Sequence, residues 1–491
     1  MDGHLGAPLA IHASRRGAAP AIVGERGVIP HAQFHRMVTA AAGAALRAGI
    51  EPGATVALRV EDRPHDLALL FGLLRIGAPL VLIGAADTPA QVAAILDRVG
   101  TRTLLRMGAR GPDDPPGTIV LGPSDFDRED PALPPAPAPG DVCIIQRSGG
   151  TTAGEPKLVA ATHAAEHDRL VTTALSGPDD RYLRVISMGF TGGMRRAISS
   201  LLVGGAIVLG PPYRAVDDFV GVARGHGATW TIMVPSQLRD LLRRVTAGPI
   251  LPGLRIRTGS AMLSPQERLD VMARLSPDLH VDYGANEVWL LATAGPDDIR
   301  DRPGTVGRAL PGTTIEIVDA DGVPVPAGTV GAIRARRPSF ATGYLHGGSR
   351  GASRFAEGWF YTGDAGHLDR DGFLYLAGRL DDLINVGALK VFPAEIEAAL
   401  TADPRVAEAL AVGVPTAGGG VRPWAAVVLR APVEASALRA RCIAALGRER
   451  APDGIVVVPA LPRTPVGKPD ARALRLMLEA RAARPKDGPA G

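Results

Sequence analysis

The chain has 491 residues, of which 46% are hydrophobic and 21% are charged, and its formal net charge is +4. This length is too great for one simple core, so two or three domains are expected. The small net charge, without a basic run or a stripe of interleaved basic and aromatic residues, gives no indication of nucleic-acid binding.

Cysteine content and apolar stretches bear on the cellular compartment. The two cysteines, Cys143 and Cys442, cannot form a disulfide framework, which favours a reducing, cytoplasmic location. Residues 1–11 have neither the basic nor the apolar region of a secretory signal. The longest apolar stretch, 67–85, is broken by Arg75, Gly77 and Pro79. It therefore predicts a helix and a buried strand, and no membrane partner is expected.

Helical and strand patterns alternate from residue 1 to about residue 130, which predicts an α/β sheet. Strands are expected at 55–60 and 79–83, with a helix at 65–76 between them. A proline-rich connector at 131–140 leads into a strand at 141–147. Asp-Gly turns at 321–322 and 371–372 then predict a small antiparallel subdomain over 310–375.

The pattern changes after residue 378. A short helix is expected at 393–400, where proline occupies the first position. Strands at 409–414 and 425–429 and helices at 436–446 and 470–483 follow it. These elements predict a compact α+β unit, and residues 484–491 are expected to form a disordered tail.

A loop rich in glycine and threonine, 148–157, follows the strand at 141–147 directly. Small residues let backbone N–H groups approach phosphate oxygens, threonine hydroxyls add donors, and Lys157 adds a positive charge. A P-loop of the Walker A type is excluded, because Gly154 is followed by Glu155 and Pro156. The loop indicates phosphate binding, with a flexible polar loop of no function as the alternative.

Lysine is scarce, with only four in the chain, at positions 157, 390, 468 and 486. A compact ammonium group on a flexible stem is not equivalent to the planar guanidinium of arginine. Lys157 closes the 148–157 loop, and Lys468 closes the sequence Pro-Arg-Thr-Pro-Val-Gly-Lys at 462–468. Both positions therefore indicate a specific contact with an anion, whereas Lys390 only follows the motif at 378–382.

Further motifs follow in order: Gly259-Ser260-Ala261, Tyr283-Gly284-Ala285-Asn286-Glu287, Tyr361-Thr362-Gly363-Asp364, and the stretches 378–384 and 462–468. With these motifs in this order, and over nearly its whole length, the chain resembles the adenylate-forming superfamily. That superfamily includes acyl-CoA and aryl-CoA synthetases, peptide-synthetase adenylation domains and luciferases. The chain looks most similar to the branch that activates aryl acids.

The resemblance implies an α/β multidomain fold. Residues 1–378 would form an N-terminal adenylation core of two α/β lobes plus a small β-barrel-like subdomain. Residues 379–483 would form a small, mobile α+β C-terminal domain, and 484–491 the tail.

The resemblance also implies a role for each motif residue, with ATP and Mg²⁺ as cofactors. Glu287 would bind Mg²⁺, and Lys468 would bridge the substrate carboxylate and the α-phosphate. Asp364 and Arg379 would bind the ribose, and Asp381 would be the hinge of the small domain. The ATP phosphates would be held by Ser148, Gly149, Gly150, Thr151, Thr152 and Lys157, and adenine by Gly259, Ser260, Ala261, Tyr283, Gly284 and Ala285.

Several positions depart from the family pattern. The phosphate loop carries one extra residue, Phe190 replaces a histidine, and Asn286 replaces a threonine. Gly387 would line the acceptor tunnel, but Ala388 stands where a second glycine is common, and its methyl group would narrow the pantetheine path. The resemblance places Phe190, Asn286 and Trp289 in the substrate pocket, where bulky aromatic rings favour small, flat acids.

Arg195 and Arg196 have two interpretations from the sequence. They either face an anionic group or, as is more common for such a pair, form a solvated helix start.

The implied function is ATP-dependent activation of a small aromatic carboxylic acid as acyl-AMP with release of pyrophosphate. Transfer to the thiol of CoA or of a phosphopantetheinyl carrier protein would follow. Three alternatives stay open: an amide synthetase with an amine acceptor, a diazotase-type enzyme that activates nitrite for an aryl amine, and a nucleotide-binding homologue without catalysis.

Overall fold

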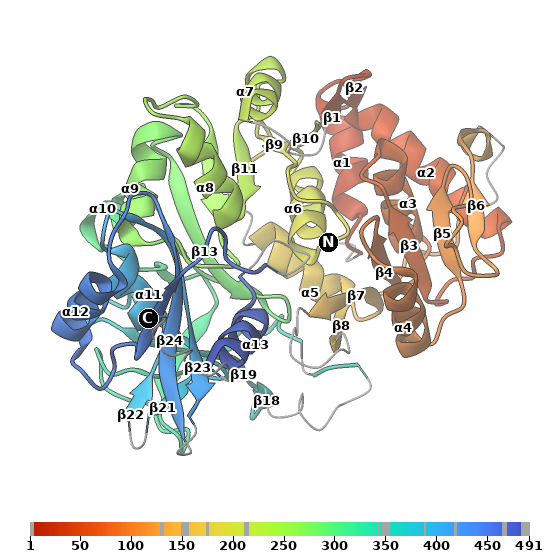
Figure 1. Ribbon diagram of the computed structural model, residues 1–491. Coiled ribbons are helices and arrows are strands. Elements are labelled where there is room, and N and C mark those ends of the chain that lie inside the picture. The colour runs from red at the N-terminus through yellow and green to blue at the C-terminus, as the bar shows by residue number, and fades with distance from the viewer. Residues whose placement is uncertain are drawn as a thin grey trace.

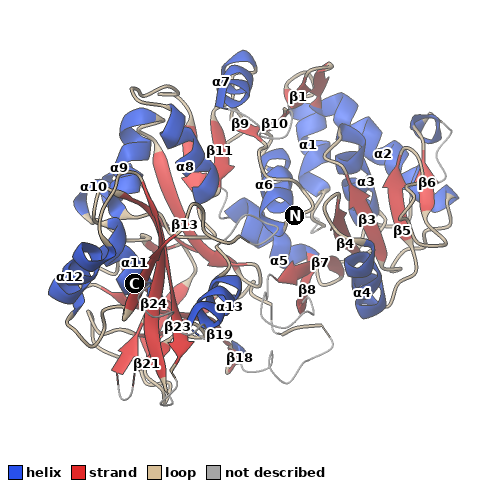
Figure 2. Cartoon of the chain, in the orientation of Figure 1, coloured by secondary structure: helices blue, strands red, loops and turns tan. Residues whose placement is uncertain are grey.

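The computed structural model describes residues 4–127, 132–148, 157–172, 176–210, 216–341, 343–345, 354–386, 389–416, 420–463 and 469–482. Two large sheets are covered by helices, a small antiparallel sheet follows, and a further α+β unit lies near the C-terminus (Figures 1 and 2). The expected α/β multidomain fold class is confirmed.

The first lobe is built on a six-stranded sheet with strand order β6-β5-β3-β4-β7-β8. All neighbouring strands are parallel except β7 and β8, which are antiparallel. The strands are β3 (Val56–Val60), β4 (Leu80–Gly84), β5 (Leu104–Met107), β6 (Ile119–Leu121), β7 (Val142–Ser148) and β8 (Lys157–Thr162). The helices of this part of the chain are α1 (Ala7–Arg15), α2 (His31–Arg47), α3 (Pro64–Arg75), α4 (Pro89–Val99), η1 (Pro123–Phe126), α5 (His163–His167) and the π-helical turn η2 (Asp168–Thr172).

Continuous apolar runs explain the interior of this lobe. All five residues of β4 are buried, as expected for a central parallel strand covered on both faces. Helix α3 packs closely against α2, because Gly72 lacks a side chain. A Cβ atom at Gly72 would lie 2.8 Å from the Ala42 backbone nitrogen.

The second lobe contains a nine-stranded sheet with strand order β15-β14-β13-β12-β11-β9-β10-β1-β2. The N-terminal hairpin β1 (Pro20–Gly24) and β2 (Gly27–Pro30) joins it through β10 (Ala206–Leu209). The other strands are β9 (Arg181–Leu183), β11 (Trp230–Met233), β12 (Arg255–Thr258), β13 (Leu279–Ala285), β14 (Trp289–Ala294) and β15 (Arg308–Ala309). The helices are α6 (Thr191–Leu202), α7 (Val216–Gly225), α8 (Pro235–Arg244), α9 (Pro265–Arg274) and α10 (Pro296–Asp301).

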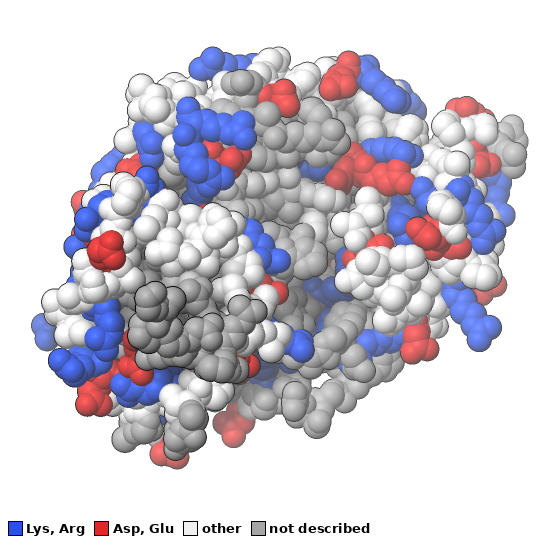
Figure 3. Space-filling model, in the orientation of Figure 1, with Lys and Arg blue, Asp and Glu red and all other residues white. Residues whose placement is uncertain are grey.

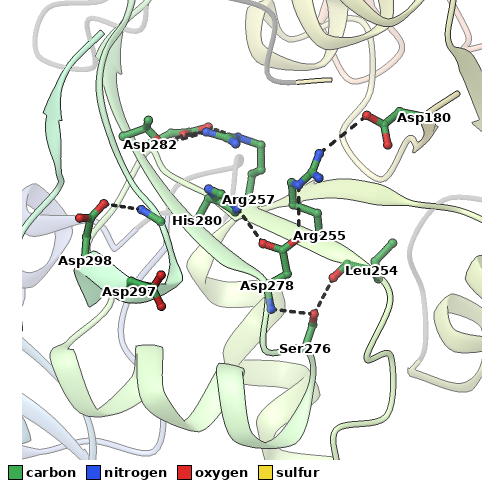
Figure 4. A network of polar contacts seen from close by, with 12 residues as sticks. Asp180, Leu254, Arg255, Arg257, Ser276, Asp278, His280, Asp282, Asp297 and Asp298 are labelled. Atoms are coloured by element: carbon green, nitrogen blue, oxygen red, sulfur yellow. Dashed lines mark hydrogen bonds and ion pairs between the residues drawn. The ribbon is translucent and has the colours of Figure 1, made fainter. Parts of the chain in front are cut away.

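A polar network fixes β12 and β13 relative to each other (Figure 4). The Arg257 Nε atom donates to Asp282 Oδ2 at 2.9 Å, and both side chains are buried. Toward the other end of the strands, Asp278 accepts from Arg255 at 3.2 Å and contacts His280 Nε2 at 2.8 Å. Strand β13 is therefore held in place where it carries the predicted adenine motif.

The expected antiparallel subdomain is a five-stranded sheet. Its order is β16-β17-β19-β18, and β20 pairs with β19. The strands are β16 (Thr314–Val318), β17 (Gly331–Arg336), β18 (Phe355–Ala356), β19 (Trp359–Leu368) and β20 (Leu374–Arg379).

The C-terminal unit has its own apolar clusters. The hairpin β21 (Ile384–Val386) and β22 (Leu389–Val391) precedes a three-stranded sheet of β23 (Val406–Pro415), β24 (Val421–Leu429) and β25 (Gly454–Val457). Its helices are α11 (Pro393–Thr401), α12 (Ala435–Leu446) and α13 (Ala471–Ala482). These elements lie at the left of Figure 1, and β3–β6 lie at the right.

The distribution of charged side chains and of apolar helices agrees with the small net charge and the broken apolar stretches of the sequence. Basic and acidic side chains are interspersed over the face shown in Figure 3. Within the described part of the chain, no helix is both long and apolar enough to cross a membrane.

Candidate active site

The predicted phosphate loop connects two paired strands. Ser148 at the end of β7 is the register partner of Lys157 at the start of β8. Gly149, Gly150, Thr151 and Thr152 lie outside the described residues, so their assignment to the phosphates stays a prediction. The Lys157 Nζ atom lies 5.2 Å from the centre of the Tyr344 ring.

Three of the residues predicted for adenine and ribose meet at one point. Tyr283 on β13 donates its hydroxyl to Asp364 Oδ2 at 2.7 Å, across 81 residues of sequence. Arg379 on β20 donates to Asp364 Oδ1 at 2.9 Å, and the two residues are register partners. Burial and the adjacent Asp364 carboxylate raise the pKa of the Tyr283 phenol, which keeps it a donor.

The motif at 259–261 follows β12 and packs against β13. A Cβ atom at Gly259 would lie 2.8 Å from the backbone oxygen of Asp282, so only glycine fits there without movement. Ser260 has a φ of +69°, in the left-handed region. In the neighbouring strand, a Cβ atom at Gly284 would lie 2.1 Å from the Trp289 backbone oxygen. Ala285 ends β13. The 259–261 motif therefore lies beside β13, at the carboxyl end of β12.

The turn between β13 and β14 carries the predicted magnesium ligand. Glu287 is 6% exposed, and its Oε1 atom accepts a hydrogen bond from the Tyr344 hydroxyl at 2.9 Å. Asn286 donates from Nδ2 to the backbone oxygen of Arg147 at 3.2 Å, and the backbone oxygen of Asn286 accepts from Arg195 Nη1 at 3.0 Å. These bonds fix the turn to β7 and α6.

This carboxylate suits a magnesium ion that is shared with a substrate. Among the described residues, no group of three or more His, Cys, Asp or Glu side chains could hold a metal ion. Mg²⁺ commonly binds through one or two carboxylates and the phosphate oxygens of a nucleotide. Glu287 fits that arrangement.

A small pocket lies beside these residues, between the ends of β4 and β7 and the start of α6. It is lined by Val81, Leu82, Ile145, Gln146, Arg147, Met188, Gly189, Thr191 and Met194. Phe190 lies between two of these residues in sequence and is 44% exposed. The Arg147 guanidinium is fixed by Asp87 at 2.8 Å and by the backbone oxygen of Gly189 at 3.0 Å.

Trp289 is enclosed by two arginines. The guanidinium carbons of Arg195 and Arg196 each lie 4.8 Å from its ring, its side chain is buried, and its φ is +70°. The ring is outside the set that lines the pocket. Its assignment to the substrate pocket, like those of Phe190 and Asn286, stays a prediction.

The interpretation of Arg195 and Arg196 as a solvated helix start was wrong. Their exposed fractions are 0% and 4%. Arg195 pairs with Glu166 at 2.8 Å, and Arg196 pairs with Asp282 at 2.8 Å. Burial raises the pKa of the Glu166 carboxyl, but the guanidinium groups of Arg195 and Arg169 outweigh it, and the pKa is lowered overall. Counter-charges distant in sequence therefore allow both arginines to be buried.

The predicted hinge and the small domain are described in part. Asp381 is exposed, and its Oδ2 atom accepts from Arg379 at 3.4 Å and from Arg354 at 3.5 Å. Gly387 and Lys468 lie outside the described residues. The residues on either side of 464–468, Arg463 and Pro469, pair with each other. The tunnel and lysine assignments stay predictions.

The protein has two lobes, an antiparallel subdomain and a separate α+β unit, and the side chains of Tyr283, Asp364 and Arg379 meet within it. This is the architecture of adenylate-forming enzymes. The model of the AMP-binding enzyme family matches residues 9–345, and that of the AMP-binding enzyme C-terminal domain matches 395–468. The chain belongs to the AMP-binding enzyme family and is an AMP-forming ligase.

Its relatives differ in substrate and acceptor. A sulfoacetate–CoA ligase of Cupriavidus necator is 32% identical over 450 residues, which cover 86% of this chain and 87% of the relative. A salicyl-AMP ligase/salicyl-S-ArCP synthetase of Mycobacterium tuberculosis is 31% identical over 489 residues, covering 91% and 85%. The structure of an amide bond synthetase from Marinactinospora thermotolerans superposes with a TM-score of 0.83 at 27% identity, covering 96% of this chain and 99% of that one.

Proposed function

We propose that this ligase uses ATP and Mg²⁺ to activate a small aromatic carboxylic acid as an acyl-AMP and then transfers the acyl group to the thiol of CoA or of a carrier protein. In the first step a carboxylate oxygen bonds to the α-phosphorus, and pyrophosphate leaves. In the second step the thiolate attacks the acyl carbon, and AMP leaves. The observation that carries this proposal is the meeting of Tyr283, Asp364 and Arg379.

Each side chain has a defined part in this proposal. Asp364 accepts hydrogen bonds from the ribose hydroxyls, and Tyr283 with the 259–261 motif contacts adenine. ATP supplies the adenylyl group that makes the carboxylate reactive. Glu287 holds Mg²⁺ beside the phosphates. Lys468 and the 148–157 loop offset the repulsion between the carboxylate and the triphosphate.

The acid class is supported by the pocket and by the relatives. Leu82, Met188 and Met194 contribute apolar side chains to the pocket, which Gln146, Arg147 and Thr191 also line. The relatives include a salicyl-AMP ligase, whose acid is aromatic, and a sulfoacetate–CoA ligase, whose acid is small. The salicyl-AMP ligase supports an aromatic acid, and both relatives support a small one.

The acceptor has one alternative with support of its own. The likeness to an amide bond synthetase favours an amine as the second nucleophile. In either case, residues 379–483 are proposed to turn about Asp381 between the two steps, relative to the core of 1–378. The separate apolar clusters of the small unit support this division. A cytoplasmic location is also proposed, supported by two free, buried cysteines.

The test is pyrophosphate release with ATP and Mg²⁺ across substituted benzoates, cinnamates, amino-aryl acids and small sulfonated acids, with nitrite included. Release with one acid is expected. Replacing Lys468 by Ala should lower that rate by roughly 10²–10³-fold, whereas Lys486→Ala removes the same charge from the predicted tail and should not. If no acid causes pyrophosphate release although the protein binds ATP, the proposed activation is contradicted.

A further inference from the structure

Tyr344 contacts two groups that the sequence motifs assign to magnesium and phosphate. Its hydroxyl donates to Glu287 Oε1 at 2.9 Å, and Lys157 Nζ lies 5.2 Å from its ring centre. Glu287 follows β13 and Lys157 begins β8, so one phenol connects two strands from different sheets. Neither contact is implied by a motif that contains Tyr344.

The fold holds Tyr344 in place from both sides. The backbone N–H of Leu345 donates to the backbone oxygen of Leu158 at 2.8 Å, which fixes the segment 343–345 along β8. The Tyr344 ring packs edge-on against Phe355 at 5.3 Å, and Phe355 lies 4.9 Å from Phe360. The direction of the hydroxyl is therefore set by packing and not by the Glu287 bond alone.

The phenol occupies only one oxygen of the carboxylate. Glu287 is buried, and within the described part of the chain only its Oε1 atom takes part in a hydrogen bond. A tyrosine phenol carries its proton at neutral pH, so Tyr344 acts as the donor to that carboxylate. A donor on one oxygen fixes the carboxylate plane and leaves the other oxygen for a cation.

We propose that Tyr344 is a positioning residue for Mg²⁺·ATP, whose hydroxyl orients the Glu287 carboxylate toward the metal. This inference rests on the proposed function, because it takes Glu287 as the magnesium ligand. Groups that orient a metal ligand typically change metal affinity or activity by about 10- to 100-fold when they are removed. The effect of losing this hydroxyl should appear in metal dependence first.

The variant Tyr344→Phe removes the hydroxyl and keeps the ring against Phe355 and Lys157. Its control is Tyr375→Phe, which removes a phenol that donates at 3.5 Å to another carboxylate, that of Asp369 in the turn between β19 and β20. Binding of Mn²⁺ in the presence of ATP is measured by electron paramagnetic resonance, a readout that needs no acid substrate. Mg²⁺-free ATP affinity is measured by calorimetry beside it.

We expect Tyr344→Phe to need about tenfold more Mn²⁺ for half-saturation, at the lower end of the range for such groups. Tyr375→Phe should bind Mn²⁺ as the native chain does, and the affinity of Tyr344→Phe for ATP without Mg²⁺ should be unchanged. Excess Mg²⁺ should restore the rate of pyrophosphate release in Tyr344→Phe. Identical Mn²⁺ curves for Tyr344→Phe and the native chain would overturn the proposal. Failure of every acid to release pyrophosphate would count against the proposed function instead, since the Mn²⁺ comparison does not use an acid.

Discussion

Both oxygens of the Asp364 carboxylate are occupied by the protein's own donors. Tyr283 donates to Oδ2 and Arg379 to Oδ1, and the Asp364 backbone N–H donates to Thr362 Oγ1 at 3.1 Å. The carboxylate is therefore fixed before any nucleotide arrives. A preorganised acceptor of this kind loses little freedom when it binds ribose.

Asp364→Ala should weaken ATP binding by about 10- to 100-fold, because a hydrogen bond to a charged group contributes roughly 1.5–3 kcal/mol. The change also leaves the buried Tyr283 hydroxyl without its acceptor and removes one of the acceptors of Arg379. Calorimetric titration with ATP measures the affinity. Asp321→Ala, at an exposed turn of the same subdomain, is the control. Equal ATP affinity in the two variants would remove Asp364 from the ribose site.

Single residues differed in how well the sequence predicted them. Tyr283, Asp364 and Arg379 stand in short motifs, and the structure brings them together. Tyr344 gave no such signal, because its partner Glu287 is 57 residues away and no pattern connects them. The same reason explains Arg195, whose partner Glu166 lies 29 residues earlier in the chain.

At the scale of elements, α6 is a helix whose charged residues point into the protein. Every residue from 193 to 202 is buried. Arg195 connects Glu166 of α5 to the backbone of Asn286, so this helix connects the interior to the turn that carries Glu287. The Gln146 amide also donates to Glu166, at 3.0 Å.

Glu166→Gln should destabilise the protein by about 3–5 kcal/mol, because it removes the carboxylate that pairs with the buried Arg195 guanidinium. The midpoint of thermal unfolding measures this loss. The exposed residue Glu51 provides the control substitution Glu51→Gln. If the two variants unfold at the same temperature, the buried charges contribute no net stability.

Local patterns predicted the elements better than their arrangement. The strands expected at 55–60 and 79–83 and the helix at 65–76 correspond to β3, β4 and α3, with ends shifted by one residue, because continuous apolar runs define them. The two-residue strands β15 and β18 exist only through pairing with β14 and β19. Pairing of β1 with β10 joins segments separated by some 180 residues, and no local pattern carries that information.

At the scale of the whole molecule, the short stretch after β20 connects the core to the small unit and contains the proposed hinge, Asp381. The Leu380 N–H donates to the backbone oxygen of Gly363 at 2.9 Å, and the Asp382 N–H donates to that of Arg379 at 3.3 Å. Asp381 lies between these two anchors, and its exposed side chain makes only long contacts with two arginines. In the proposed movement, a change in the backbone angles of Asp381 rotates the small unit relative to the core.

Asp381→Pro tests whether the two half-reactions need such a turn. Proline holds φ near −65°, so the chain is restricted in the conformations that it can reach at this point. We expect one half-reaction to fall by about 10²-fold more than the other, because misplacement by roughly 1 Å has that effect on rate. Pyrophosphate exchange measures the first step, and transfer from preformed acyl-AMP measures the second.

The control Asp381→Ala removes the same side-chain contacts without restricting φ. Both steps should persist in it, because exposed ion pairs contribute at most about 1 kcal/mol. Equal loss of both steps in Asp381→Pro would show that the small unit does not turn about this residue.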